Sequence, residues 1–294
     1  LAGAAGGNTA AAQAYIADVT PPEDRPAALG LVGAAFGLGF VFGPAIGGLL
    51  ASSTAVSLAR RLFPAFVPVT PFSLPSFAAA GFSFLALGAA AVVLSEPDRI
   101  RSPARKVTFV TQFRTALADA TLRPLVTAFF LTSLAFAGLT VMFVPFVADF
   151  FGYDATDAAL FLAYIGALGV VNQGVLIGWL SRRIGVRLVV RAGVLSLFSA
   201  LVLIAVSPLA GSIPIAAGPD WLTGGFVVLL AFGALASFGN GAITVGLASL
   251  VSEAATADTQ GSAFGVTQAA GSLGRTIGPP VAAAAYVFVY WSPF

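Results

Sequence analysis

The side chains that most often carry chemistry are scarce in this sequence. It has 14 basic and 12 acidic residues among 294 positions, and it contains no histidine and no cysteine. These absences exclude thiolate nucleophiles, cysteine-ligated metals and the commonest general base. Arg275 is the only charged residue well inside a long apolar stretch, where a charge usually faces protein or water. We therefore expect no metal, no cofactor and no enzyme.

Uncharged polar and aromatic residues inside apolar stretches are the remaining candidates for contact with a small molecule. Phe129 and Phe136 share one helical face with Ser133 and Thr140 because their spacing follows the helical period. Asn240 lies in a second apolar stretch, one turn before a threonine. Taken alone, each of these side chains fits an interhelical hydrogen bond or packing better than contact with a small molecule.

The elements that position these residues must be membrane helices. Hydrophobic residues make up 58% of the chain and charged residues 9%, with a mean hydropathy of +0.96. Soluble domains carry roughly 25% charged residues, so a soluble enzyme and a disordered chain are both excluded. A net charge of +2 is too small for nucleic-acid binding. The chain is predicted to be an all-α integral membrane protein whose main partner is the lipid bilayer.

Seven apolar segments are long enough to cross a membrane, and residues 1–17 resemble an eighth. The seven segments are 29–51, 76–95, 124–147, 158–180, 189–207, 223–250 and 263–289. The sequence begins at Leu1 in an apolar stretch and ends in another. We interpret it as an internal fragment of a longer chain.

The basic residues are distributed unevenly between the loops on the two sides of these segments. Eleven lie in 18–28, 96–123 and 181–191, whereas 52–75, 148–157 and 208–222 hold two. The first set is therefore predicted to be cytoplasmic, together with 251–262. The longest charged loop, 96–123, is interpreted as a central linker between residues 1–95 and 124–294. The alternative is one large loop within a single bundle.

An internal repeat favours the linker. With a shift of 235 residues, Gly30–Pro44 aligns with Gly265–Pro279, and seven of these 15 positions are identical. Six helices separate the two copies, so both cross the membrane in the same direction. Two parallel six-helix halves are the repeat pattern of one large transporter class. The chain then covers helices 4 to 11 of twelve.

At this point the sequence resembles the major facilitator superfamily along essentially its whole length. The most specific match is a helix-5 antiporter motif, which in the family is a mark of exporters and seals one end of the pathway. Its fixed positions are occupied by Gly30, Gly39, Gly43, Pro44, Gly47 and Gly48. The alternative is a generic face of small residues that lets helices approach closely.

A second match is similar to the family's loop motif between helices 8 and 9. The positions that fit are Gly178, Arg183, Gly185 and Arg187. Arg182 stands where the family usually has aspartate, so it is not carried over. The resemblance implies a gating role for this loop, and the alternative is a plain basic turn on the cytoplasmic side.

A third match places the chain near the tetracycline and multidrug efflux branch. Ala14–Asp18, Asp24-Arg25 and the segment from Leu74 resemble that branch's helix 4–5 junction and helix 6. In the family the acid at Asp18 pairs with a loop arginine, and Glu253 is expected to make the equivalent contact with Arg183 or Arg187. Both acids are otherwise solvated helix ends.

The resemblance also implies which residues face the substrate. Family helices 4, 7 and 10 line the central cavity, which makes Asn8, Phe129, Phe136 and Asn240 lining candidates. Arg275 precedes Gly278-Pro279, a pattern common in this branch. It is expected either to gate the pathway or contact substrate, or instead to snorkel or bond backbone carbonyls.

The resulting hypothesis is a monomeric, multi-pass exporter of amphipathic drugs or small organic compounds in the cell membrane. It is expected to work by alternating access and proton antiport, with the proton-coupling carboxylates outside this sequence. The nearest rival is an importer of a metabolite or sugar with the same fold. A membrane-embedded enzyme is a remote alternative, because no cluster of Asp, His or Cys is present.

Overall fold

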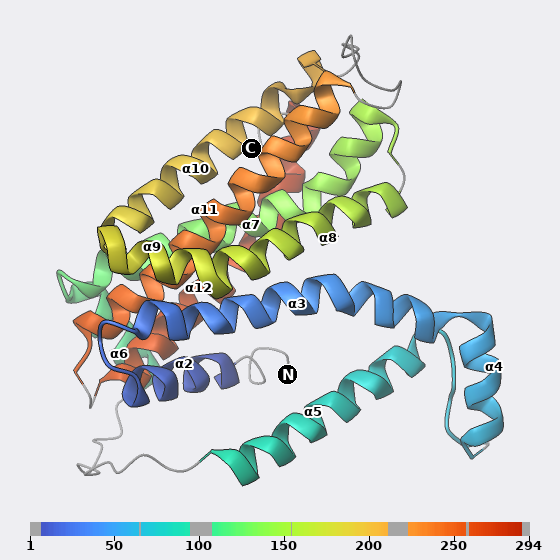
Figure 1. Ribbon diagram of the computed structural model, residues 1–294, viewed down its shortest axis with the longest axis horizontal. Coiled ribbons are helices and arrows are strands. Elements are labelled where there is room, and N and C mark those ends of the chain that lie inside the picture. The colour runs from blue at the N-terminus through green and yellow to red at the C-terminus, as the bar shows by residue number, and fades with distance from the viewer. Residues whose placement is uncertain are drawn as a thin grey trace. The chain divides into compact units, whose positions relative to one another are not determined.

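The computed structural model describes residues 7–64, 66–94, 108–153, 155–210, 223–256 and 259–289, and these contain eleven α-helices (Figure 1). They are α2 (Gly7–Val19), α3 (Arg25–Ala51), α4 (Ser53–Leu62), α5 (Ser73–Val93), α6 (Phe109–Ala118), α7 (Leu122–Phe151), α8 (Ala155–Val171), α9 (Ile177–Ile184), α10 (Val186–Val206), α11 (Gly224–Ala254) and α12 (Gln260–Phe288). A π-helical turn, η1 (Asn172–Leu176), joins α8 to α9, and a 3-10 turn, η2 (Ser207–Ala210), follows α10.

The long helices confirm the predicted all-helical membrane architecture. By length and composition, five helices among the described residues can cross a membrane, namely α5, α7, the continuous α8–α9 segment, α10 and α11. Each coincides with a predicted span. The predicted spans 29–51 and 263–289 lie within α3 and α12, and the described part of 1–17 forms α2.

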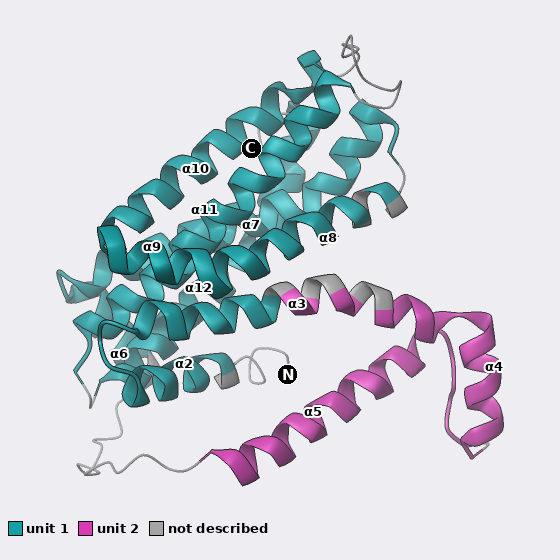
Figure 2. Cartoon of the chain, viewed as in Figure 1, with its two compact units in different colours: residues 1–37, 102–294 teal, residues 38–101 magenta. Residues whose placement is uncertain are grey.

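The chain divides into two compact units (Figure 2). Unit 1 contains residues 1–37 and 102–294, and unit 2 contains residues 38–101. Unit 1 therefore joins α2 and the first part of α3 to all helices from α6 onward. Residues 96–107 of the predicted linker lie outside the described residues, so its role as a connection between helical halves stays a prediction.

Two short helices lie where the sequence predicted only loops. Helix α4, in unit 2, buries Val56 and Ala59 against Val69 and Leu74. The Nε of Arg60 donates a hydrogen bond to the carbonyl oxygen of Val69 at 3.0 Å, which holds the following loop against the helix. Ten residues cannot span a bilayer, and a search for long apolar runs overlooks such amphipathic helices.

Helix α6 occupies the second half of the predicted linker. It buries Ala116 in a cluster with Val126 of α7 and Val266 and Ala270 of α12. Downstream, Asp119 Oδ1 accepts hydrogen bonds from the backbone N–H groups of Thr121 and Leu122, at 2.7 and 2.8 Å, and so caps the start of α7. This part of the linker therefore packs within unit 1, against α7 and α12.

Glycines bring α7 and α12 into close contact. A Cβ added to Gly274 would lie 2.5 Å from the carbonyl oxygen of Phe130, and one added to Gly138 would lie 2.9 Å from the Cβ of Ala282. A Cβ on Gly278 would overlap the carbonyl oxygen of Leu134. Small residues permit such close backbone approach between membrane helices. This explains the glycine content of the last predicted span.

Aromatic side chains fill the core between α7, α8 and α11. Phe143 stacks on Phe232 with ring centroids 5.9 Å apart, and it meets Phe161 edge-on at 6.1 Å. Phe146 and Leu229 are fully buried in the same cluster. This cluster fixes the ends of the three helices around the cavity described below.

Candidate functional site

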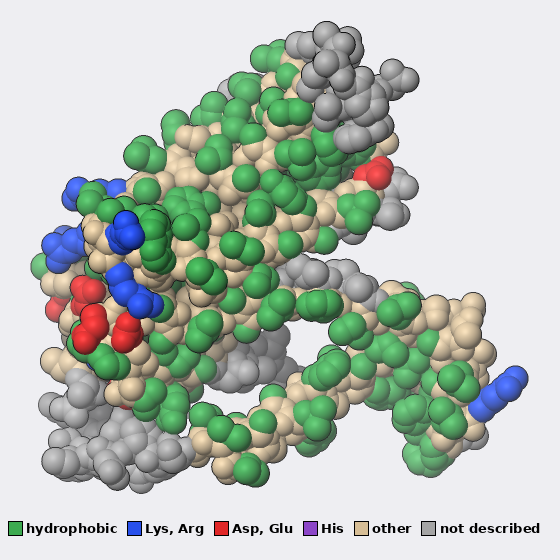
Figure 3. Space-filling view, viewed as in Figure 1, with side chains coloured by type: hydrophobic (Ala, Val, Ile, Leu, Met, Phe, Trp, Pro, Cys, Tyr) green, Lys and Arg blue, Asp and Glu red, His purple; other side chains and the backbone are tan. Residues whose placement is uncertain are grey.

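Charged residues gather at one end of unit 1, which we call the basic end. Here α2, α9 and α11 finish and α3, α10 and α12 begin. Figure 3 shows the acidic and basic side chains collected there. The basic end carries Asp24, Arg182, Arg183 and Arg187.

At the basic end, α2 packs against α11 and α12 through small side chains. The members of this cluster are Ala10, Ala14, Ala17, Leu29, Ala248, Val251, Ala263 and Phe264. Within it, Gln268 Nε2 donates a hydrogen bond to Gln13 Oε1 at 2.9 Å, across 255 residues of sequence. Gln13 is only 5% exposed. The contact therefore joins the predicted N-terminal and C-terminal halves through a polar pair in which Gln13 is buried and Gln268 is half-buried.

The start of α3 packs against η1 and α9 through glycines of both predicted motifs. A Cβ on Gly178 would lie 2.9 Å from both the Cα and the Cβ of Ala27. A Cβ on Gly30 would overlap the backbone carbonyl of Gln173, and one on Gly33 would overlap the Gln173 side-chain amide. Gln173 lies in the π-helical turn, an irregularity that is frequent at functional sites.

We call the packing of α2 and α3 against α9, α11 and α12 the closure, and polar contacts of Arg25 and Arg182 add to it. Arg25 donates from Nε to the carbonyl oxygen of Thr20 at 3.2 Å and from Nη1 to that of Ser252 at 3.5 Å. Arg182 Nη1 lies 3.7 Å from Asp24 Oδ1, with both side chains about half exposed, at 57% and 52%. An exposed ion pair of this kind stabilises by only about 0–1 kcal/mol. The apolar packing thus dominates the closure.

The ion pair involves an arginine that the family pattern did not point to. Arg182, set aside because it replaces the usual aspartate, makes the contact between the two halves. Glu253 is exposed at the end of α11, and among the described residues no ion pair joins it to Arg183 or Arg187. Asp18 is half-buried near the end of α2.

The remaining loop-motif residues have local roles in the structure. Gly185 ends α9 with φ of 85°, a conformation that favours glycine. The Arg183 guanidinium lies 4.7 Å from the centre of the Trp179 ring in a cation–π contact. Arg187 is exposed at the start of α10. A gating role for these residues stays a prediction.

The predicted antiporter motif lies entirely within α3, and among the described atoms an added Cβ meets neighbours only at its first glycine, Gly30. For Gly39, Gly43, Gly47 and Gly48, no described atom lies within 4 Å of an added Cβ. The side chain of Pro44 lies outside the described residues. The sealing role of these five positions stays a prediction.

The predicted lining residues do not converge on one described cavity. Phe129 is 6% exposed and packs with Leu197, Ile243 and Leu247. Phe136 packs against the aromatic core. Asn240 is half-buried in α11, and the side chain of Asn8 lies outside the described residues.

The residues predicted around the Gly-Pro pattern of α12 are also spread. Arg275 is exposed, and its Nη2 donates to Ser272 Oγ on the same helix at 3.1 Å. Gly278 is buried against α7, as described above, and Pro279 is half-buried. This geometry gives Arg275 neither a gating role nor a substrate contact, and both stay predictions.

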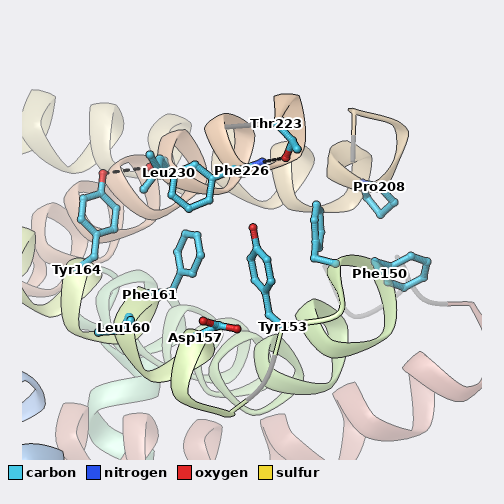
Figure 4. Close-up of a pocket in the computed structure, with 11 residues that line it drawn as sticks. Phe150, Tyr153, Asp157, Leu160, Phe161, Tyr164, Pro208, Thr223, Phe226 and Leu230 are labelled. Atoms are coloured by element: carbon cyan, nitrogen blue, oxygen red, sulfur yellow. Dashed lines mark hydrogen bonds between the residues drawn. The ribbon is translucent and has the colours of Figure 1, made fainter. Parts of the chain in front are cut away.

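The sequence analysis missed a cavity at the opposite end of unit 1, which we call the aromatic pocket. It has a volume of about 780 Å³ and lies between the end of α7 and the starts of α8 and α11 (Figure 4). Asp157 and Tyr153 are among its lining residues. The density of aromatic residues between 150 and 164 was the available signal, but it also fits ordinary packing.

Comparisons with known proteins agree with this architecture. The family profile described as Major Facilitator Superfamily matches residues 1–279. The class C tetracycline resistance protein of Escherichia coli is 31% identical over 289 residues, which are 97% of this chain and 64% of that protein. Multidrug resistance protein 1 of Bacillus subtilis is 32% identical over 176 residues, 58% of this chain and 40% of that protein.

A solved structure has the same fold. The crystal structure of the human organic anion transporter MFSD10 (TETRAN) matches with a TM-score of 0.71 at 23% identity, covering 97% of this chain and 64% of that one. The chain thus spans less than two thirds of the length of these full-size proteins. Three observations agree: the profile match, the helical architecture and the repeat of Gly30–Pro44 in Gly265–Pro279. The chain belongs to the Major Facilitator Superfamily, a family of membrane transporters.

Proposed function

We propose that this chain forms most of the transport pathway of a secondary exporter of amphipathic organic compounds. The exporter works by alternating access between two helical halves and exchanges its substrate for protons. Its basic end faces the cytoplasm, as the distribution of arginines predicts. The chain is a monomer in the cell membrane, with residues 96–123 linking the halves.

The closure at the basic end is the observation that carries this proposal. Helices α2 and α3 belong to the predicted first half, and α9, α11 and α12 belong to the second. Their contact combines the part-buried Gln13–Gln268 pair with glycine-mediated packing at Gly30 and Gly178. Such a contact can separate as a unit when the halves rock about a central site. In this proposal, the contact at the basic end is what closes the pathway on the cytoplasmic side.

Export and substrate class are supported by resemblance. The helix-5 glycine pattern is typical of exporters, and the matched relatives include proteins named for resistance to tetracycline and to multiple drugs. Amphipathic compounds also suit a pathway whose helices are rich in phenylalanine, of which the chain has 26.

Inside-out membrane vesicles provide the test. The protein carrying this sequence is expressed, a proton gradient is established, and tetracycline or ethidium is added. An antiporter moves the compound into the vesicle and releases protons, so the gradient falls and the compound accumulates. Vesicles without the protein are the control. Accumulation that survives collapse of the gradient by a protonophore contradicts proton coupling. Uptake only by right-side-out vesicles supports the importer instead.

A further inference from the structure

The aromatic pocket has the size and composition of a ligand site that no predicted motif includes. Its volume of about 780 Å³ falls within the range of roughly 300–1,000 Å³ typical of small-molecule sites. Six of its lining residues are aromatic, and they come from α7, α8, α11 and the loop between α7 and α8 (Figure 4). They are Phe150, Phe151, Tyr153, Phe161, Tyr164 and Phe226.

The rings form a connected wall. Tyr153 stacks on Phe161 with centroids 6.0 Å apart, and Phe161 meets Phe226 edge-on at 5.7 Å. Behind them, Phe161 contacts Phe143 of the buried aromatic core at 6.1 Å. The wall is therefore held in place by the core. Aromatic rings attract a cation that lies over a face, so a cavity lined by several rings suits an organic cation.

The polar groups of the pocket have distinct tasks. The hydroxyl of Tyr164 donates to the carbonyl oxygen of Leu230 at 3.2 Å, and Thr223 Oγ1 accepts from the backbone N–H of Phe226 at 3.2 Å. Both contacts fix the start of α11. Asp157, in the first turn of α8, is the one charged side chain among the described lining residues. No arginine or lysine is among those lining residues.

The electrostatics of the pocket oppose negative charge. Burial, and secondly the nearby Asp157 carboxylate, raise the pKa of the Tyr153 phenol above its ordinary value. Tyr153 therefore stays neutral at physiological pH, and Asp157 leaves the described lining with a single negative charge. A carboxylate beside several ring faces selects for a positive ligand with an apolar body.

We propose that the aromatic pocket is a binding site for organic monocations that carry bulky apolar groups, with Asp157 as the counter-charge and Tyr153, Phe161 and Phe226 as the ring wall. It lies at the end of unit 1 opposite the closure, on the side that the arginine distribution predicts to be external. The site belongs to the second half of the chain alone, and it goes beyond the export proposal because it requires neither transport nor a proton gradient.

Binding of two matched ions tests the site. Tetraphenylphosphonium and tetraphenylborate have the same four phenyl groups and opposite charges, so they separate charge recognition from apolar partition. Equilibrium dialysis with the purified, detergent-solubilised protein measures the dissociation constant of each ion without a gradient. We expect saturable binding of the cation and weaker binding of the anion.

Two variants of Asp157 locate the counter-charge. Asp157→Asn is expected to weaken cation binding about fivefold, which corresponds to about 1 kcal/mol, and to reduce the preference over the anion. Asp157→Glu keeps the charge and should bind nearly as the parent. Glu23→Gln, which neutralises an exposed acid at the basic end, is the matched control and should change neither ion.

Two variants of Tyr153 test the ring wall. Tyr153→Phe keeps the aromatic face and should retain cation binding, whereas Tyr153→Leu keeps the apolar volume and should lose affinity for the cation more than for the anion. The proposal would be overturned if the parent bound both ions equally and Asp157→Asn changed neither affinity. Such a result would show an apolar groove filled by lipid or detergent. Such a result would not affect the export assay.

Discussion

Gln13 and Gln268 meet side chain to side chain at 2.9 Å although 255 residues separate them in the sequence. The pair joins α2 to α12, two helices that also pack together through a cluster of mostly small buried side chains at the point where the two predicted halves touch. A net hydrogen bond contributes about 0.5–1.5 kcal/mol, and a buried amide left without its partner costs more. This pair is therefore expected to favour the closed state of the basic end.

Gln13→Ala should shift the equilibrium toward opening at the basic end. Because the chain contains no cysteine, a single Ala17→Cys substitution reports on this closure, since Ala17 is fully buried there. We expect maleimide labelling of Cys at that position to rise several-fold when Gln13→Ala is added, in line with about 1 kcal/mol. Ser262→Ala, which removes a hydrogen bond within one end of α12, is the control. Unchanged labelling would show that the amide pair does not stabilise the closure.

The repeat supplies a matched pair of glycines. An added Cβ at Gly30 overlaps the backbone carbonyl of Gln173, whereas its repeat counterpart Gly265 has no described atom within 4 Å. Gly30→Ala should therefore open the basic end and raise labelling at position 17, since overpacking costs about 1–3 kcal/mol. Gly265→Ala should leave the labelling unchanged. Gly33→Ala should lie between them because its closest contacts are with the amide end of the Gln173 side chain, which can move, rather than with backbone. Equal effects at Gly30 and Gly265 would contradict the packing.

The spans were predictable because burial in lipid requires long apolar runs, and such runs can be read locally. The family was predictable from glycines and prolines at fixed spacing. The ion-pair partner of Arg182 was not predictable, because an ion pair across the halves depends on how helices meet in three dimensions. The pocket around Tyr153 was not predicted for a different reason: five of its six rings lie between residues 150 and 164, where they equally fit ordinary packing, and only the fold brings Phe226 to them. Helix α4 was not predicted because its ten amphipathic residues resemble a polar loop.

Reversing the charge of Arg182 tests its ion pair with Asp24. Arg182→Asp restores the residue that the family usually has, but here it faces Asp24 and should weaken the closure. Because both side chains are about half exposed, the loss should stay within about 1 kcal/mol and should shrink at high salt. The double variant Asp24→Arg/Arg182→Asp should recover the original labelling at position 17. If the labelling change of the double variant is the sum of the changes in the two single variants, the two residues do not interact.

The cap at the start of α7 predicts a pH dependence of stability. Backbone hydrogen bonds from Leu122 and Thr121 lower the pKa of Asp119 below its ordinary value of 3.8. A lowered folded-state pKa means that this stabilisation is fully present above the unfolded value and is lost as the pH falls through the folded value. The difference in thermal midpoint between the parent and Asp119→Ala should thus be constant at neutral pH and narrow in acid below about pH 4. A difference that widens in acid would contradict the cap.

Gly43 tests whether the antiporter motif acts in the other state of the transport cycle. No described atom lies within 4 Å of an added Cβ at Gly43, whereas one at Gly278 overlaps the carbonyl oxygen of Leu134. Gly278→Leu should therefore lower the thermal midpoint of the purified protein, and Gly43→Leu should leave it nearly unchanged. If the motif seals the pathway by close packing after the basic end opens, Gly43→Leu should still abolish export.

The physical reason is that the penalty of overpacking, about 1–3 kcal/mol, then falls on one state alone. A difference of 1.4 kcal/mol changes the ratio of two states about tenfold, which is enough to trap the transporter without unfolding it. Gly43→Ala should be milder because it adds one methyl group. Export assays in vesicles and the thermal midpoints of the purified variants together distinguish a loss of export from a loss of stability. Normal export by Gly43→Leu at parental expression would show that this face of α3 contacts only lipid in both states, and the helix-5 pattern would no longer support the exporter assignment.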